Sequence, residues 1–281
     1  MGPARDDAGM TQALPPLLLV GCGKMGGAML AGWLERGLSD AVVVEPNPAA
    51  AAAFAGRAQV VASPEEVPAG FRPAAAVLAI KPQEAASTLP GLSRFVAPET
   101  VFLSIMAGQT VAGIRAGLGS ADAAVVRAMP NTPAAVRQGF TVAFPAPEVS
   151  SAQRDLADVL LASVGEVAWV EEEGLLDPVT AVSGGGPAYV FLLAEVMEAA
   201  AVEQGLPPDL AQRMARATVS GSGALLAASA DDTAALRRAV TSPKGTTERA
   251  LQVLMAPDAW PKLMSRAIEA ATARSRELAR G

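Results

Sequence analysis

The feature that most constrains this chain is a glycine-rich segment between a predicted strand and a predicted helix. The apolar run Leu17 to Val20 predicts the strand, and Gly21-Cys22-Gly23-Lys24-Met25-Gly26 follows at once. Helical periodicity then runs from Gly27 to Arg36. Glycines here permit a tight turn and close approach of the backbone to a pyrophosphate, which the helix N-terminus attracts. The pattern predicts a dinucleotide-binding turn, and the alternative is an ordinary glycine-rich turn.

An acidic residue follows the second predicted strand. Glu45 comes directly after Ala41 to Val44, about 20 positions beyond Gly26, where a carboxylate normally binds the adenosine ribose. It would also repel a 2′-phosphate, and no Lys or Arg follows it before Arg57. On charge we expect NADH to be preferred over NADPH. The alternative is a solvated carboxylate at a strand end.

The first part of the chain alternates β-branched runs with Ala-rich helical stretches, which is typical of an α/β domain with a parallel sheet covered by helices on both faces. Further strands are predicted at Val60–Val61, Ala75–Ile80, Val101–Ile105, Ala124–Ala128 and Thr141–Phe144. After about residue 170 the pattern becomes purely helical, with helices expected at Pro187–Gly205, Asp209–Ser229, Thr233–Val240, Thr246–Leu254 and Pro261–Ala279. We therefore expect a flexible tail over 1–14, a dinucleotide-binding domain over 15–170 and an all-helical domain over 171–281.

The first helix of the second domain is apolar around most of its circumference. It is opened by Ser183-Gly184-Gly185-Gly186-Pro187, where proline at the first turn costs no hydrogen bond, and it runs to Gly205. Such a helix must be buried on several sides, which favours burial in an oligomer.

Composition excludes several classes of protein. In 281 residues, 51% hydrophobic and 18% charged side chains predict a folded chain. The net charge is −6 and no basic domain is present, which argues against nucleic-acid binding. A single cysteine and no histidine exclude an internal disulfide, histidine-based triads and histidine metal sites. The longest apolar stretch, Tyr189 to Val202, is interrupted by Glu195 and Glu198, so we expect no membrane span and a cytoplasmic location.

Two strand exits in the first domain carry polar or rigid loops. Ala79-Ile80-Lys81-Pro82 ends one strand, where the edge of such a sheet faces the ligand, and Lys81 suits contact with cofactor ribose or phosphate. Arg127-Ala128-Met129-Pro130-Asn131-Thr132-Pro133 ends another and should lie near the nicotinamide. A surface lysine and a simple structural turn are the alternatives.

A third loop precedes the fourth helix of the second domain. In Thr241-Ser242-Pro243-Lys244-Gly245-Thr246-Thr247-Glu248, Gly245 allows close backbone approach, and the first N–H groups of the helix would bind an anion such as a carboxylate. Threonine hydroxyls can donate hydrogen bonds to a reacting atom. The alternative is a plain helix N-cap.

Together these segments resemble pyrroline-5-carboxylate reductase over nearly the whole chain from Leu17. The most specific matches are Arg127 to Pro133, Ser183 to Tyr189 and Ser242 to Thr247. The resemblance implies a Rossmann domain followed by a helical dimerisation domain that interlocks with its partner in a homodimer, with decamers as a further assembly. It implies reduction of 1-pyrroline-5-carboxylate to proline by hydride transfer from NADPH or NADH, with no metal.

The resemblance also implies roles for individual positions. Thr247 matches the threonine that hydrogen-bonds the ring nitrogen, and Thr247 would be catalytic. Substrate contacts are implied for Glu173, Ser242, Gly245, Thr246 and Thr247. Cofactor contacts are implied for Gly21, Cys22, Gly23, Lys24, Met25, Gly26, Glu45, Ala79, Ile80, Lys81, Pro82, Ile105, Met106 and Ala107.

The chain departs from the family pattern at some positions. Lys244 stands where the family usually has a second glycine, and its cation would either attract the substrate carboxylate or point to solvent. The run Ser183-Gly184-Gly185-Gly186 has glycine where many members have serine. Arg238-Ala239 replaces an Asp-Asn pair found near the nicotinamide in some members, so no role is assigned to these two residues.

Three alternative functions remain open. A 3-hydroxyacid dehydrogenase would need a lysine between Pro187 and Gln204, and none is there. A reductase of another cyclic imine is a second alternative, and comparing turnover of substrates with five- and six-membered rings would separate the two. A non-catalytic nucleotide-sensing module need not retain the loop from Ser242 to Thr247.

Overall fold

The computed structural model describes residues 13–280, and the chain divides into two compact units. The first comprises the chain up to Gly184 together with residues from Ala273 onward, and the second is Gly185–Thr272. Residues 171–184, which we predicted with the helical domain, thus cluster with the sheet. Of the predicted tail, residues 1–12 lie outside the described part, and Leu14 is buried in the core of the first unit.

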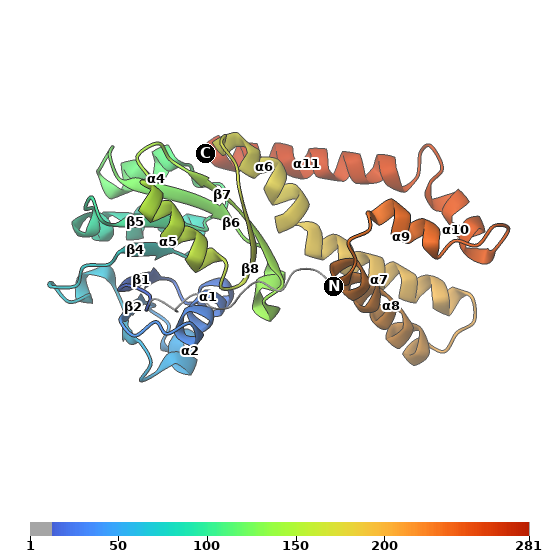
Figure 1. Ribbon diagram of the computed structural model, residues 1–281, viewed down its shortest axis with the longest axis horizontal. Helices are drawn as coiled ribbons and strands as arrows, with labels where there is room; N and C mark the ends of the chain where they lie inside the picture. Colours follow the sequence, from blue (N-terminus) through green and yellow to red (C-terminus); the bar gives the residue numbers. More distant parts are fainter. Residues whose placement is uncertain (1–12, 281) are drawn as a thin grey trace. The chain divides into compact units, whose positions relative to one another are not determined.

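The first unit is built on an eight-stranded sheet of order β3-β2-β1-β4-β5-β6-β7-β8. Figure 1 shows this sheet with helices such as α1 (Lys24–Glu35), α4 (Val111–Leu118) and α5 (Ser151–Leu161) beside it. Its strands are β1 (Leu17–Val20), β2 (Ala41–Val44), β3 (Gln59–Val61), β4 (Ala75–Leu78), β5 (Val101–Ser104), β6 (Ala124–Met129), β7 (Gly139–Pro145) and β8 (Gly165–Trp169). The prediction of an α/β domain followed by an all-helical region is confirmed. Every strand predicted from the sequence is present within a few residues of its expected bounds.

The far end of the sheet differs from the parallel arrangement that we predicted. Strands β1 to β6 are parallel, but β7 pairs with β6 in the antiparallel sense, and β8 pairs parallel with β7. Strand β8 was not predicted from the sequence. This edge strand is only partly buried, so it lacks the continuous apolar run that marks the central strands.

Helices and 3-10 turns cover both faces of this sheet. Helices α1 (Lys24–Glu35) and α5 (Ser151–Leu161) pack on one face, and α3 (Ala85–Thr88), η4 (Leu89–Phe95) and α4 (Val111–Leu118) pack on the other. The remaining short elements are α2 (Pro48–Ala51), η1 (Ala52–Phe54), η2 (Pro64–Glu66), η3 (Pro82–Glu84), η5 (Thr132–Val136), η6 (Glu173–Leu175), α6 (Leu176–Val179) and the π-helix η7 (Thr180–Gly184). Central strands are buried on both sides, which accounts for their unbroken apolar sequences.

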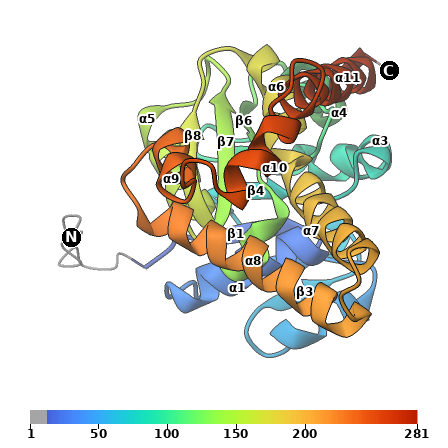
Figure 2. The same cartoon turned by 90° about the vertical axis from the view of Figure 1, so that its right-hand side faces the viewer.

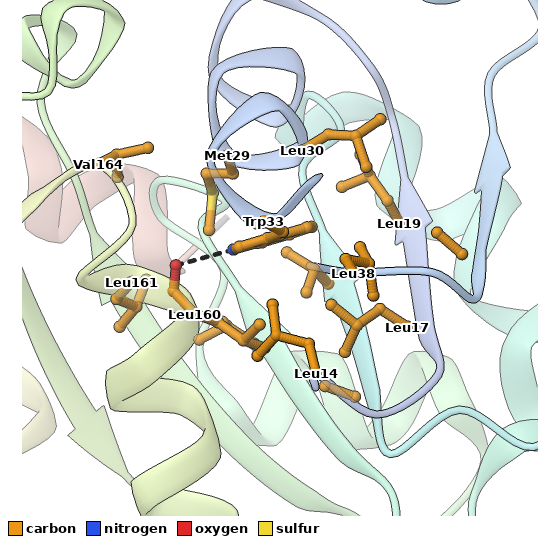
Figure 3. Close-up of a cluster of buried hydrophobic side chains, with 14 of the residues drawn as sticks. Leu14, Leu17, Leu19, Met29, Leu30, Trp33, Leu38, Leu160, Leu161 and Val164 are labelled. Carbon is orange, nitrogen blue, oxygen red and sulfur yellow. Dashed lines mark hydrogen bonds between the residues drawn. The ribbon is translucent and has the colours of Figure 1, made fainter. Parts of the chain in front are cut away.

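Helix α1 is joined to α5 through one buried tryptophan. Figure 3 shows Trp33 among the leucines of the core, with its indole N–H donating a hydrogen bond to the carbonyl of Leu160 at 2.9 Å. The Arg36 guanidinium donates to the carbonyls of Val159 and Ala162. These bonds satisfy carbonyls at the C-terminal end of α5, which have no partner within their own helix. The helix that follows the glycine-rich turn is therefore held firmly in place.

The second unit consists of helices. They are α7 (Gly186–Glu203), α8 (Pro208–Ala228), α9 (Thr233–Ala239), α10 (Thr246–Leu254) and α11 (Trp260–Arg280), the last turns of which belong to the first unit. Helices α7 and α8 pack against each other (Figure 2). No residue of α7 is buried in the single chain, and Phe191 is 69% exposed. Helix α7 therefore presents an exposed apolar surface in the single chain.

Candidate functional site

The glycine-rich turn after β1 has room only for glycine at two of its positions. Gly21 has φ of +91°, and a Cβ there would lie 2.6 Å from the carbonyl oxygen of Ala79. A Cβ on Gly26 would lie 2.3 Å from the carbonyl oxygen of Gly21. The first glycine thus permits the turn, and the third allows α1 to pack closely against it.

The middle glycine has a different environment. A Cβ on Gly23 would meet no atom within 4 Å, so the backbone there borders open space. Gly23 is also the N-cap of α1, where no described side chain caps the helix and no acidic residue occupies the first turn. An open helix N-terminus behind an approachable backbone fits a pyrophosphate, which helix dipoles and free N–H groups stabilise.

The predicted cofactor residues are brought together at one edge of the sheet. Val20 is in register with Leu78, and Leu78 with Ser104, so Gly21, Ala79 and Ile105 follow three neighbouring strand ends. The strand order reverses between β1 and β4, and ligands of open α/β sheets bind beside such a reversal. Of the other predicted cofactor residues, Met106 is buried, Lys81 is exposed, and the remaining three are half-buried: Ile80, Pro82 and Ala107.

Glu45 lies at the same edge and binds the glycine-rich turn directly. Its Oε2 accepts a hydrogen bond from the Cys22 N–H at 2.8 Å, and its Oε1 accepts one from the Asn47 N–H at 2.9 Å. Burial, and to a lesser degree the nearby charge of Glu45, raise the pKa of the Cys22 thiol to about 11. Each carboxylate oxygen can accept more than one hydrogen bond, so contact with a ribose hydroxyl is still available to Glu45.

Two of the three most specific motifs contact each other. The Asn131 amide donates to Ser183 Oγ at 3.2 Å, and its oxygen accepts from the Phe140 N–H at 2.9 Å. A Cβ on Gly184 would lie 2.7 Å from the methyl carbon of Met129. The exit of β6 is therefore built against the π-helix η7, a contact that the separate positions of the motifs in the sequence did not predict.

Glu173 also lies in the first unit, where its carboxylate oxygen Oε1 has two donors. It accepts from the Val111 N–H at 2.7 Å and from Arg127 Nη1 at 2.7 Å. The resemblance implied a substrate contact for Glu173, and its pairing with Arg127 was not predicted. The two residues are 46 positions apart, and no local sequence pattern indicates that such distant residues form a pair.

The loop before α10 lies in the second unit and forms an open helix N-terminus. Gly245 is the N-cap of α10 and no side chain caps it, while Thr246 and Thr247 are exposed in the single chain. The Lys244 N–H donates to Glu248 Oε2 at 2.8 Å, and the Gly245 N–H donates to the Ser242 carbonyl at 3.0 Å. These bonds hold the loop in a shape that leaves the helix N-terminus available to an anion.

Lys244 has φ of +62°, the left-handed region in which glycine is the favoured residue. This conformation explains why a second glycine is the usual residue here, as the resemblance to the family indicated. The described residues contain no group of three or more His, Cys, Asp or Glu side chains that could hold a metal ion.

Comparison with known proteins agrees with this geometry. Residues 173–278 match the family model for pyrroline-5-carboxylate reductase dimerisation, and residues 17–108 match that for coenzyme F420-dependent NADP oxidoreductases. The chain is 37% identical to a pyrroline-5-carboxylate reductase of Pseudomonas aeruginosa, over 94% of this chain and 97% of that protein.

Two solved structures are similar along nearly the full chain. A pyrroline-5-carboxylate reductase from Coxiella burnetii has a TM-score of 0.86 at 30% identity, covering 94% of this chain and 98% of that one. The Plasmodium falciparum pyrroline carboxylate reductase, solved with NADP bound, has a TM-score of 0.79 at 25% identity, covering 95% and 100%.

Proposed function

The chain belongs to the pyrroline-5-carboxylate reductase family, and from this premise we infer that it reduces 1-pyrroline-5-carboxylate to proline with NAD(P)H. The observation that carries the assignment is the similarity over nearly the full length to a named reductase, combined with a glycine-rich turn that fits a dinucleotide. The test is the loss of NAD(P)H absorbance when the purified protein meets pyrroline-5-carboxylate. No turnover with either nucleotide would overturn the assignment.

The first unit supplies the dinucleotide site. The backbone around Gly23 and the N-terminus of α1 bind the pyrophosphate, and Glu45 contacts the adenosine ribose. Support comes from the open space at Gly23 and from the position of Glu45 at the end of β2. When bound, the reduced nicotinamide supplies the hydride that reduces the C=N bond.

The N-terminus of α10 supplies the substrate site. The N–H groups of Thr246 and Thr247 bind the ring carboxylate, while Ser242 and Gly245 shape the loop around it. The Thr247 hydroxyl donates a hydrogen bond to the ring nitrogen, which makes the C=N carbon a better hydride acceptor. A hydroxyl is a weak acid, so the proton itself comes from water. Where the substrate is already protonated, the ring N–H donates to the Thr247 hydroxyl instead. Support comes from the uncapped helix N-terminus and the exposed threonines.

Glu45 leads us to propose NADH as the preferred nucleotide. Its carboxylate would repel a 2′-phosphate, whereas the related Plasmodium enzyme was solved with NADP. The measurement is kcat/KM for each nucleotide in wild type and in Glu45→Gln. We expect wild type to favour NADH and the variant to shift towards NADPH. A strong wild-type preference for NADPH would refute this role of Glu45.

The helical region is the site of oligomerisation in this family, since the dimerisation model covers residues 173–278. The stretch Glu173–Glu203 is long and apolar enough to pass for a membrane span by composition, but it lies within that match. We propose that α7 is covered by a second copy in a homodimer, that dimers assemble into decamers, and that the enzyme works in the cytoplasm. Sedimentation of the purified protein gives the mass that tests the assembly.

A further inference from the structure

Glu173 makes hydrogen bonds within the protein that a substrate-binding role does not explain. Its Oε1 accepts from the first residue of α4, Val111, and from Arg127 on β6. We propose that Glu173 is a positioning residue, which clamps the loop between β5 and α4 and thereby aligns the residues that bind the dinucleotide. The proposal rests on the proposed function, because that loop contains the predicted cofactor contacts Ile105, Met106 and Ala107.

The clamp acts at the end of the loop through Val111. The Thr110 hydroxyl accepts the N–H of Gly113 at 3.1 Å, as an ordinary N-cap does, but this leaves the N–H of Val111 without an acceptor inside α4. Glu173 supplies that acceptor from another part of the chain. A carboxylate at a helix N-terminus is also favoured by the helix dipole.

The same carboxylate acts at the beginning of the loop through Arg127. Arg127 is paired in register with Ser104, the last residue of β5, after which the loop starts. The side chains of Arg127 and Glu173 are only 12% and 30% exposed, so water screens their ion pair little. One carboxylate oxygen therefore ties together both ends of the segment 105–110.

The middle of this loop is packed as well. Gly108 has φ of +74°, and a Cβ placed there would lie 3.3 Å from the Cβ of Leu278, near the end of α11. Met106, which precedes it, is buried, and its N–H donates to Ser104 Oγ at 3.3 Å. A loop with these internal supports keeps its shape when its two ends are fixed, and Glu173 fixes them.

The test compares Glu173→Ala with Glu173→Gln, measuring the nucleotide dissociation constant in the absence of substrate, and kcat and KM for the imine. We expect Glu173→Ala to raise the dissociation constant about tenfold and to lower kcat, as loss of a hydrogen bond to a charged group does. Glu173→Gln keeps an oxygen for the Val111 N–H, so we expect about a threefold change. A rise in the KM for the imine with unchanged nucleotide binding would overturn the proposal and restore Glu173 as a substrate contact.

Glu148→Gln is the matched control, because Glu148 pairs with Arg115 on the same helix α4 but away from the loop. It should leave nucleotide binding unchanged. Combining Glu173→Gln with Arg127→Met removes both charges of the ion pair, and we expect the double variant to be no worse than the poorer single variant. Additive losses would show that the residues do not act as a pair and would overturn the clamp. Nucleotide binding is measured without turnover, so a wild type that cannot reduce the imine would defeat the proposed function while leaving this test intact.

Discussion

The N–H of Cys22 donates a hydrogen bond to the carboxylate of Glu45, with 2.8 Å between the nitrogen and Oε2. This bond joins the end of β2 to the glycine-rich turn after β1. It makes Glu45 part of the framework of the turn as well as a candidate contact for ribose. It also places a negative charge beside the only cysteine of the chain.

The buried Cys22 thiol should make stability fall at high pH. Burial, and then the charge of Glu45, raise its pKa from 9.0 to about 11. Between these values the folded protein keeps the proton while the unfolded chain releases it, so the free energy of unfolding decreases as pH rises from 9 to 11. Denaturant unfolding across this window measures the slope. Cys22→Ala should show a shallower decline, and identical slopes would contradict the prediction.

Alanine substitutions at Gly21 and Gly23 should have different effects, the first on stability and the second on nucleotide binding. Gly21→Ala places a Cβ 2.6 Å from the Ala79 carbonyl oxygen at φ of +91°, so we expect a loss of about 1–3 kcal/mol in stability. Gly23→Ala meets no atom within 4 Å and should melt like wild type. Its methyl group occupies the space where the pyrophosphate approaches, so nucleotide affinity should still fall. Calorimetric melting and nucleotide titration of both variants provide the check, and unchanged affinity in Gly23→Ala would place the pyrophosphate elsewhere.

Thr247→Ala should lower kcat/KM for the imine and leave nucleotide affinity almost unchanged. Removing one positioned donor to a reacting atom typically costs about a hundredfold in rate. Thr247→Ser keeps the hydroxyl and should retain most of the activity. Steady-state kinetics with varied imine concentration distinguish the variants. Unaltered turnover in Thr247→Ala would remove the hydroxyl from the mechanism.

Lys244→Gly should stabilise the protein slightly, because glycine adopts φ of +62° without the steric cost that a Cβ brings. The cost is roughly 1 kcal/mol for a non-glycine residue, partly offset by the greater freedom of glycine in the unfolded chain. Lys244→Ala removes the charge but keeps the strain. If the cation attracts the substrate, the KM for the imine at low salt should rise equally in both variants. An unchanged KM in both variants would show that the Lys244 side chain points to solvent and does not attract the substrate.

Phe191→Asp should break the dimer. Phe191 is 69% exposed in the single chain and lies on α7, within the region that matches the dimerisation family. A charge buried at an interface without a partner is strongly unfavourable. Sedimentation equilibrium should show a lower mass for this variant than for Asp209→Asn, a surface change on α8. Equal masses would mean that this side of α7 faces solvent in the assembly.

Local patterns in the sequence determined most of the sheet and the position of the cofactor turn. Strands such as Val101–Ser104 are buried on both faces, so their composition alone identifies them, and glycine at positions 21 and 26 is required by the turn itself. Strand β8 was missed because an edge strand needs no continuous apolar run, and its half-exposed residues resemble a loop.

Only the tertiary structure decided which distant groups meet. The pairing of Glu173 with Arg127 and Val111 and the bond from Cys22 to Glu45 join residues from separate elements. Side-chain hydrogen bonds depend on distances in space, which a linear pattern does not encode, whereas turns and buried strands depend on neighbours along the chain. The sequence therefore determined the kind of fold and the chemistry of its loops. Only the folded sheet determined which groups donate hydrogen bonds to the carboxylates of Glu45 and Glu173.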